Sequence, residues 1–198
     1  MGISEAGPLV PRRGGPIRAA LGRGFLRVLG WRVETEFPNL AKCVVSAAPH
    51  SSNWDFFLGI AAVFALRLDI RWIGKKELFR GPLDPLMRWL GGIPVDRSAP
   101  QHFVDEMARA FAARTGLLVA IAPEGTRTPV PKWKTGFLRI ARGAGVPVVP
   151  GYFDNARKRI GFGTPIHLTD DAEGDLARLR AFYARFTRRD GRPAIAAS

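Results

Sequence analysis

The chain of 198 residues contains one cysteine, Cys43, so it cannot form an internal disulfide bond or a zinc site built from several cysteines. Cys43 lies in the apolar run 43–47, where we expect a buried structural thiol rather than a nucleophile. A chain without disulfides suits a reducing compartment, so the sequence predicts a cytoplasmic protein. No residue cluster calls for a metal, and we expect neither a metal nor a cofactor.

Long hydrophobic runs are also missing. The longest, from Phe56 to Leu66, is well short of the roughly 20 residues that span a bilayer. Near the N-terminus, Arg18, Arg23 and Arg27 interrupt every apolar stretch that could form the centre of a secretory signal. The sequence therefore predicts a protein that does not cross a membrane, although it can lie on one.

Acidic residues are scarce relative to basic ones, 17 Asp and Glu against 30 Lys and Arg, which gives a net charge of +13. Such a charge predicts an anionic partner: nucleic acid, an anionic membrane surface, an acidic protein or a phosphorylated small molecule. No nucleic-acid-binding motif is recognisable, so we expect no nucleic-acid partner. A hydrophobic content of 46% argues against disorder and for one domain with a sizeable core.

The order of expected elements predicts one α/β domain over residues 1–198, with a mixed, mostly parallel β-sheet flanked by helices. Apolar runs bounded by Gly, Pro or Asn predict strands at 43–47, 70–74, 93–95, 117–121 and 146–149, and an extended segment at 159–168. Helical periodicity predicts helices at 53–66, 100–114, 135–144 and 170–189. Residues 75–80 and 83–90 are expected to form surface helices or an interfacial, acyl-binding surface. The arginines of the closing helix are expected to form a solvated face, with lipid headgroups or an acidic carrier protein as alternative contacts; they are Arg178, Arg180, Arg185, Arg188 and Arg189.

The N-terminal part divides in two. Residues 1–15 are rich in Gly, Pro and Arg and are expected to form a mobile basic arm. Residues 16–32 place apolar side chains at helical spacing with arginines between them, which predicts an amphipathic basic helix. Such a helix suits a membrane interface, and packing against the domain is the alternative.

A histidine and an aspartate, His50 and Asp55, are separated by four residues at the end of the first expected strand. Five positions along a helix correspond to about 140° of rotation, so the two side chains cannot share a helix face. We therefore place His50 on the loop and Asp55 in the first turn of the following helix, where the carboxylate can accept a hydrogen bond from one imidazole nitrogen. That leaves the other nitrogen free to take a proton as a general base.

Four short motifs occur in an order that resembles the glycerolipid acyltransferases, the group that includes 1-acylglycerol-3-phosphate acyltransferases. They are His50 with Asp55, the run 92–97 (Gly-Ile-Pro-Val-Asp-Arg), the run 123–127 (Pro-Glu-Gly-Thr-Arg) and the run 146–150 (Val-Pro-Val-Val-Pro). The resemblance covers about residues 42–151, and Lys134 and Gly136 also match the segment after the third motif. The chain departs from the family pattern at Pro49 and Ala122, neither of which removes a functional group.

The resemblance implies a reaction and a set of roles. His50, oriented by Asp55, would deprotonate the hydroxyl of a lysophospholipid, above all 1-acyl-sn-glycerol-3-phosphate. The hydroxyl would then attack an acyl thioester without a covalent enzyme intermediate. The acceptor's glycerol phosphate would be held by residues of the second and third motifs: Arg97, Glu124, Gly125, Thr126 and Arg127. The acyl-donor site would be shaped by Lys134, Gly136, Pro147 and Pro150.

The implied partners are an anionic membrane surface, the lysophospholipid acceptor, and acyl-CoA or an acidic acyl-carrier-protein as the donor substrate. Many family members begin with long hydrophobic segments, so this chain is expected to be a compact version, peripheral on the inner face of the cell membrane. Another lyso-lipid acceptor is the first alternative. A non-catalytic protein that binds anionic lipid or nucleic acid is the second.

Overall fold

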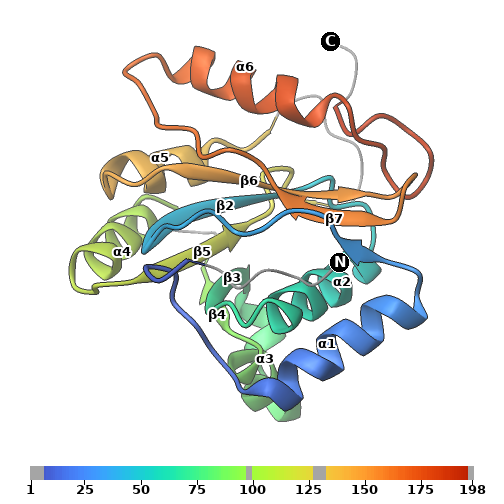
Figure 1. The fold of residues 1–198 in the computed structure, drawn as a ribbon. Helices are drawn as coiled ribbons and strands as arrows, with labels where there is room; N and C mark the ends of the chain where they lie inside the picture. Colours follow the sequence, from blue (N-terminus) through green and yellow to red (C-terminus); the bar gives the residue numbers. More distant parts are fainter. Residues whose placement is uncertain (1–6, 97–99, 127–132, 196–198) are drawn as a thin grey trace.

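The computed structural model describes residues 7–96, 100–126 and 133–195, which form a layered α/β domain (Figure 1). The strands are β1 (Arg32–Val33), β2 (Lys42–Ala48), β3 (Ile70–Lys75), β4 (Gly92–Val95), β5 (Leu117–Ile121), β6 (Val148–Asp154) and β7 (Arg159–Phe162). The α-helices are α1 (Pro16–Val28), α2 (Asn53–Ala65), α3 (Asp84–Trp89), α4 (Pro100–Ala112), α5 (Gly136–Gly143) and α6 (Ala172–Tyr183). Two short 3₁₀ helices, η1 (Lys76–Phe79) and η2 (Gly81–Leu83), precede α3.

The strands form one sheet in the order β1-β7-β6-β2-β5-β3-β4. Every neighbouring pair is parallel except β6 and β7, which are antiparallel. The predicted fold class, a mostly parallel mixed sheet flanked by helices, is therefore confirmed. Because β2 lies between β5 and β6 and runs parallel to both, the carboxyl ends of these three strands meet at one edge of the sheet.

Helices cover both faces of the sheet (Figure 1). The alternation of β2 explains why, because Val44 is buried in the cluster formed with α4, α5 and α6, whereas Cys43 and Val45 are buried in a cluster on the opposite face. On that second face, α1 and α2 pack against the ends of β6 and β7 through a further cluster that contains Leu26, Leu58 and other residues. Because helices cover both faces of the sheet, the residues of β2 and β5 are apolar almost without interruption.

Helix α1 packs on α2 along a face where two of the three buried residues are small. The buried residues are Ala19, Gly22 and Leu26. A Cβ atom on Gly22 would lie 2.5 Å from the carbonyl oxygen of Ala61 and 2.7 Å from the backbone nitrogen of Ala65. The close crossing of the two helices therefore requires glycine at this position.

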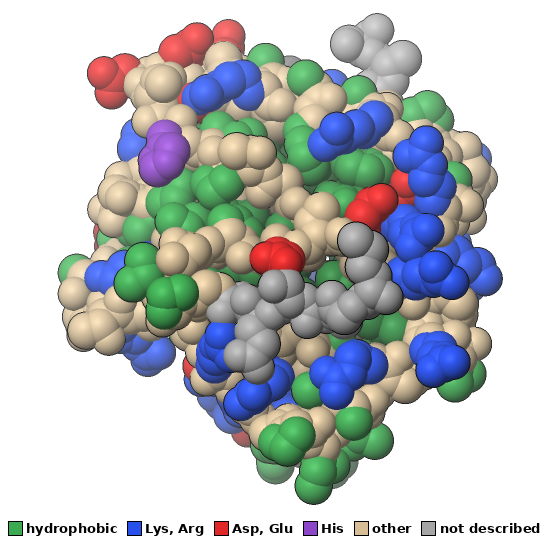
Figure 2. Space-filling view, in the orientation of Figure 1, with side chains coloured by type: hydrophobic (Ala, Val, Ile, Leu, Met, Phe, Trp, Pro, Cys, Tyr) green, Lys and Arg blue, Asp and Glu red, His purple; other side chains and the backbone are tan. Residues whose placement is uncertain are grey.

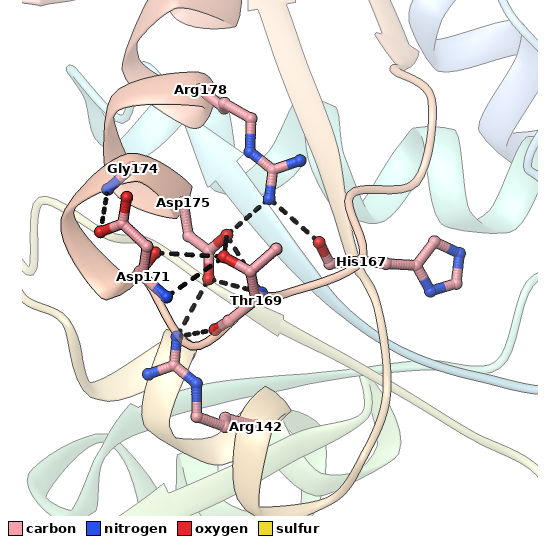
Figure 3. Close-up of polar contacts among 7 residues, drawn as sticks. All are labelled: Arg142, His167, Thr169, Asp171, Gly174, Asp175 and Arg178. Carbon is pink, nitrogen blue, oxygen red and sulfur yellow. Dashed lines mark hydrogen bonds and ion pairs between the residues drawn. The ribbon is translucent and has the colours of Figure 1, made fainter.

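Helix α6 is fixed at its N-terminal end by the buried carboxylate of Asp175 (Figure 3). This carboxylate accepts hydrogen bonds from Arg142 at 2.9 Å, from Arg178 at 2.5 Å and from the backbone nitrogen of Thr169 at 3.0 Å. Burial on its own raises the pKa of Asp175, but the hydrogen bonds from Arg178 and Thr169 outweigh it, so the pKa is lowered from its ordinary value.

Two expectations about the chain ends are wrong. Helix α6 ends at Tyr183, and the following segment, residues 184–195, folds back on itself: the backbone nitrogen of Ala194 donates to the carbonyl of Phe186 at 3.0 Å. The predicted free arm, as far as it is described, lies against the domain from Gly7 onward. Val10 is buried, and the backbone nitrogen of Arg13 donates to the carbonyl of Arg67 at 2.9 Å.

Candidate functional site

The site lies where β2 and β5 end. β2 leads into His50 and β5 leads into Glu124, and the two strands are hydrogen-bonded neighbours. The backbone nitrogen of His50 donates a 2.8 Å hydrogen bond to Oε2 of Glu124, across 74 residues of sequence. The structure therefore brings the first and third sequence motifs together, as the parallel pairing of their strands requires.

Asp55 is buried and organises the loop that carries His50. Its Oδ2 accepts hydrogen bonds from the backbone nitrogens of Ser51 at 2.5 Å and Ser52 at 2.7 Å. Ser52 is the N-cap of α2 and forms a capping box with Asp55. The other oxygen, Oδ1, is buried and has no hydrogen-bond partner within the described part of the chain.

The imidazole of His50 is partly open to solvent, with 26% of its side chain exposed, and it faces the buried carboxylate. Nδ1 lies 3.9 Å from Oδ2 of Asp55, so the pair would have to approach to about 3 Å to form a hydrogen bond. Catalytic hydrogen bonds are often long before substrate binds. Because Nδ1 is the nitrogen next to Asp55, Nε2 is the candidate for contact with a substrate hydroxyl.

Glu124 is almost fully buried, at 2% exposed, and both of its oxygens are bound within the protein. Oε2 accepts from the backbone of His50, and Oε1 lies 3.3 Å from Nη1 of Arg188. Burial raises the pKa of Glu124 to about 7, and the nearby charge of Asp55 adds to this. The His50 amide and the Arg188 guanidinium act in the opposite direction. The role of Glu124 in holding the acceptor stays a prediction.

Arg188 is the residue that the sequence interpretation missed. It was expected on the solvated face of the closing helix, but it is 2% exposed and pairs with Glu124 and, at 3.7 Å, with Asp190. Nothing in its local sequence marks it, because four other arginines lie within the same run. Its partner is 64 residues away, so the pair becomes visible only in the fold.

The other predicted site residues are placed as follows. Gly125 has a left-handed backbone with φ of 65°, next to the aliphatic part of Lys134, which a Cβ would approach to 2.9 Å. Thr126 follows in the same turn, and Gly136 is the first residue of α5. Pro150 is buried within β6, and Pro147 precedes that strand. The two predicted phosphate ligands, Arg97 and Arg127, lie outside the described residues.

An exposed apolar face lies on α1. Ile17 is 77% exposed, Leu21 67% and Val28 86%, and Phe25 also lies on this face. A second group of exposed apolar side chains belongs to η1, η2 and α3: Leu78, Leu83, Leu86 and Trp89. Figure 2 shows hydrophobic side chains gathered at the bottom of the view, where Figure 1 draws α3 and the start of α1. Lys and Arg side chains crowd the right-hand side of the same view.

Within residues 7–96, 100–126 and 133–195, no helix has both the length and the apolar character needed to cross a membrane. No group of three or more His, Cys, Asp and Glu side chains in this part of the chain could hold a metal ion.

Comparison with known proteins gives two matches. The sequence model of the family described as Acyltransferase matches residues 32–154. The fold is similar to the crystal structure of the 1-acyl-sn-glycerophosphate (LPA) acyltransferase PlsC from Thermotoga maritima, with a TM-score of 0.54 and 19% sequence identity. That similarity covers 87% of this chain and 80% of the other. No curated protein sequence matches the chain.

Proposed function

The chain belongs to the acyltransferase family, and on that basis we propose that it moves a fatty acyl group from an acyl thioester to the free hydroxyl of a lysophospholipid. The expected acceptor is 1-acyl-sn-glycerol-3-phosphate, the class of substrate named for the T. maritima protein of similar fold. The observation that carries the proposal is the partly exposed His50 imidazole directed at the buried Asp55 carboxylate.

The proposed reaction has one proton relay. Nε2 of His50 takes the proton of the acceptor hydroxyl while the hydroxyl oxygen attacks the thioester carbonyl carbon. The carbon–sulfur bond then breaks, and the imidazolium returns the proton to the leaving thiolate. Asp55 stabilises the imidazolium through Oδ2, which lies 3.9 Å from Nδ1 of the ring.

The positive net charge of the chain suits an acceptor that carries a phosphate. With a net charge of +13, the protein attracts anionic lipids at a membrane surface and phosphorylated acceptors alike. The turn Glu124-Gly125-Thr126 follows β5 directly beside His50, which supports it as the place where the glycerol phosphate lies. The arginines proposed to clamp that phosphate are Arg97 and Arg127.

The arrangement of α1 supports attachment to a membrane. An amphipathic helix that merely packed on the domain would bury most of its large apolar residues. Helix α1 buries Leu26 together with the small residues Ala19 and Gly22, but it exposes the large residues Ile17, Leu21 and Val28. Arginines lie on the same helix, as is typical of interfacial helices. We propose that this face rests in the boundary of an anionic bilayer, on the cytoplasmic side of the cell membrane.

The reaction is tested by acyl transfer from labelled acyl-CoA to a panel of lysophospholipids. Wild type should transfer the label and His50→Ala should lose it, by about 10²-fold or more. The exposed histidine His167 provides a matched control, and His167→Ala should keep full activity. Full activity of His50→Ala would refute the general-base role, and silence of wild type with both acyl-CoA and acyl-carrier-protein donors would refute the function.

Asp55→Asn separates the charge of Asp55 from its capping role. The amide oxygen can still accept the hydrogen bonds from Ser51 and Ser52, so the fold should be kept. The loss of the negative charge should lower kcat with little change in KM for the acceptor, because Asp55 acts only when the imidazolium forms. An unchanged kcat would remove Asp55 from the mechanism.

Vesicle flotation tests the α1 face. The double change Leu21→Glu and Val28→Glu places two charges on the exposed side of α1 and should abolish flotation with anionic vesicles. Leu9→Glu is the control, since Leu9 is 60% exposed but lies before α1. Equal flotation of all three proteins would place the membrane contact elsewhere.

A further inference from the structure

A cavity of about 400 Å³ opens beside the His50 loop. Four separate segments line it: the residues after α1, the first turns of α2, the turn between β6 and β7, and the C-terminal segment. Its volume is within the range of about 300–1,000 Å³ that is typical of small-ligand sites. Among the described residues of the sequence motifs, Trp54, which lies between His50 and Asp55 in the sequence, lines the cavity.

The cavity combines aromatic and aliphatic side chains with positively charged ones. Trp31 and Leu58 are buried and Trp54 is half exposed, so the cavity has an aromatic and aliphatic side, and Asn155 and two charged residues form a polar side. Both charged side chains that line the cavity, Lys158 and Arg189, are cations. Within the described residues, no ion pair joins either of them to a carboxylate. A site of this composition suits an anion attached to an apolar body.

The cations are held in place by the backbone. Lys158 has a left-handed backbone with φ of 51° in the turn between β6 and β7, and its Nζ lies 3.4 Å from the carbonyl oxygen of Leu29. The main chain of Arg189 is held by its nitrogen, which donates to Oγ of Ser51 at 3.1 Å, and the guanidinium lies over the Trp54 ring, 6.0 Å from its centre. Through this hydrogen bond, a residue that lines the cavity contacts Ser51, the residue that follows His50.

The cavity also adjoins the exposed apolar face of α1. Val28, the last residue of the helix and 86% exposed, is followed immediately by the cavity-lining Leu29. An amphiphile held at a membrane surface can therefore reach the cavity with its apolar part along α1 and its anionic group at the cations.

We propose that this cavity binds the phosphate of an anionic amphiphile, with the phosphate between Lys158 and Arg189 and the adjoining apolar part against Trp31 and Trp54. The inference rests on the proposed function in one respect, which is that the acceptor phosphate lies at the Glu124–Thr126 turn. The cavity would then be a second phosphate site, and His50 would lie between the acceptor and the molecule bound in the cavity. The phosphate could belong to the coenzyme of the acyl donor or to an anionic lipid of the bilayer, and the test separates these sources.

The test is equilibrium binding in a His50→Ala background, so that no turnover occurs. One arm measures binding of octanoyl-CoA by calorimetry, and the other measures flotation with phosphatidylglycerol vesicles. The variant is Lys158→Gln with Arg189→Gln, which keeps the backbone hydrogen bond of Arg189. The control is Arg109→Gln with Arg114→Gln, which removes two exposed charges near the end of α4, before the start of β5.

We expect the cavity variant to lose at least about tenfold in affinity in one arm, while the control stays near wild type. Loss for octanoyl-CoA alone assigns the phosphate to the donor, and loss for vesicles alone assigns it to a lipid headgroup. Equal losses in the cavity variant and the control would show unspecific attraction by net charge and overturn the proposal, as would no loss in either arm. These outcomes do not depend on turnover, so failure of the cavity and failure of the proposed reaction are distinguishable.

A spectroscopic readout gives an independent check. Binding in the cavity should change the tryptophan fluorescence, and Trp54→Phe should reduce that change while most of the affinity stays, because Trp31 in the cavity wall still responds. An equal fluorescence change in wild type and Trp54→Phe would place the ligand away from Trp54 and contradict the proposal.

Discussion

Removal of the buried guanidinium of Arg188 should destabilise the protein in a manner that depends on pH. Arg188 and Glu124 are both 2% exposed, and the charged atoms lie 3.3 Å apart. At an effective dielectric constant of about 20, their attraction is about 5 kcal/mol. Breaking a buried pair by removing one partner typically costs about 3–5 kcal/mol, because the remaining charge is left without compensation.

The pH dependence follows from Glu124. Its pKa is raised from an ordinary value of 4.5 to about 7, so the native state holds a proton that the unfolded state releases between these values. Stability from this group is therefore fully present below about pH 4.5 and is lost as the pH rises through 7, in total by about 3 kcal/mol. Arg188 limits that loss by favouring the ionised form, so its contribution grows as Glu124 ionises.

The assay is urea unfolding of wild type and Arg188→Met at pH 5.5 and pH 8. The variant should lose about 3–5 kcal/mol at pH 8 and clearly less at pH 5.5, where Glu124 is mostly protonated. Arg185→Met, an exposed change in the same segment, should cost less than about 1 kcal/mol at either pH. The double variant with Glu124→Gln should recover part of the loss. Equal losses at both pH values, or strictly additive effects in the double variant, would refute the reasoning.

Two further predictions concern packing and acid stability. Gly22→Ala should lower the free energy of unfolding by about 1–3 kcal/mol, because its Cβ would meet the backbone of α2. The control is Gly24→Ala in the same helix, whose Cβ meets nothing within 4 Å and which should stabilise the protein slightly. Denaturation of both variants checks this, and equal effects would disprove the close crossing. The lowered pKa of Asp175 means that its stability contribution is present above its ordinary value of 3.8 and is lost as the pH falls through the folded value. Acid unfolding should therefore be less steep in Asp175→Asn, which is also less stable at pH 7, and an unchanged acid transition would argue against this role.

Some disagreements between the predicted and observed elements have identifiable causes. The strand predicted to end at Val149 continues as β6 to Asp154, although Pro150 has no N–H to donate. Its carbonyl still accepts a 2.7 Å hydrogen bond from Gly163, and the pairing with β2 continues beyond it. The closing helix stops at Tyr183 rather than Arg189, and the segment that follows it places Arg188 against its buried partner Glu124. Both corrections depend on contacts between distant segments, which local propensity does not record.

The sequence by itself determined the features that depend on local chemistry and on the order of elements. The alternation of apolar runs with helical segments is enough to indicate a mostly parallel sheet, and the spacing of His50 and Asp55 is enough to place one on a loop and the other at a helix start. Only the tertiary structure decided which side of α1 faces outward, that Glu124 is paired with Arg188, and that Lys158 and Arg189 share one cavity. The physical reason is that each of these features joins segments far apart in the chain. Their contact is set by how the helices pack on the sheet, and no spacing between residues encodes it.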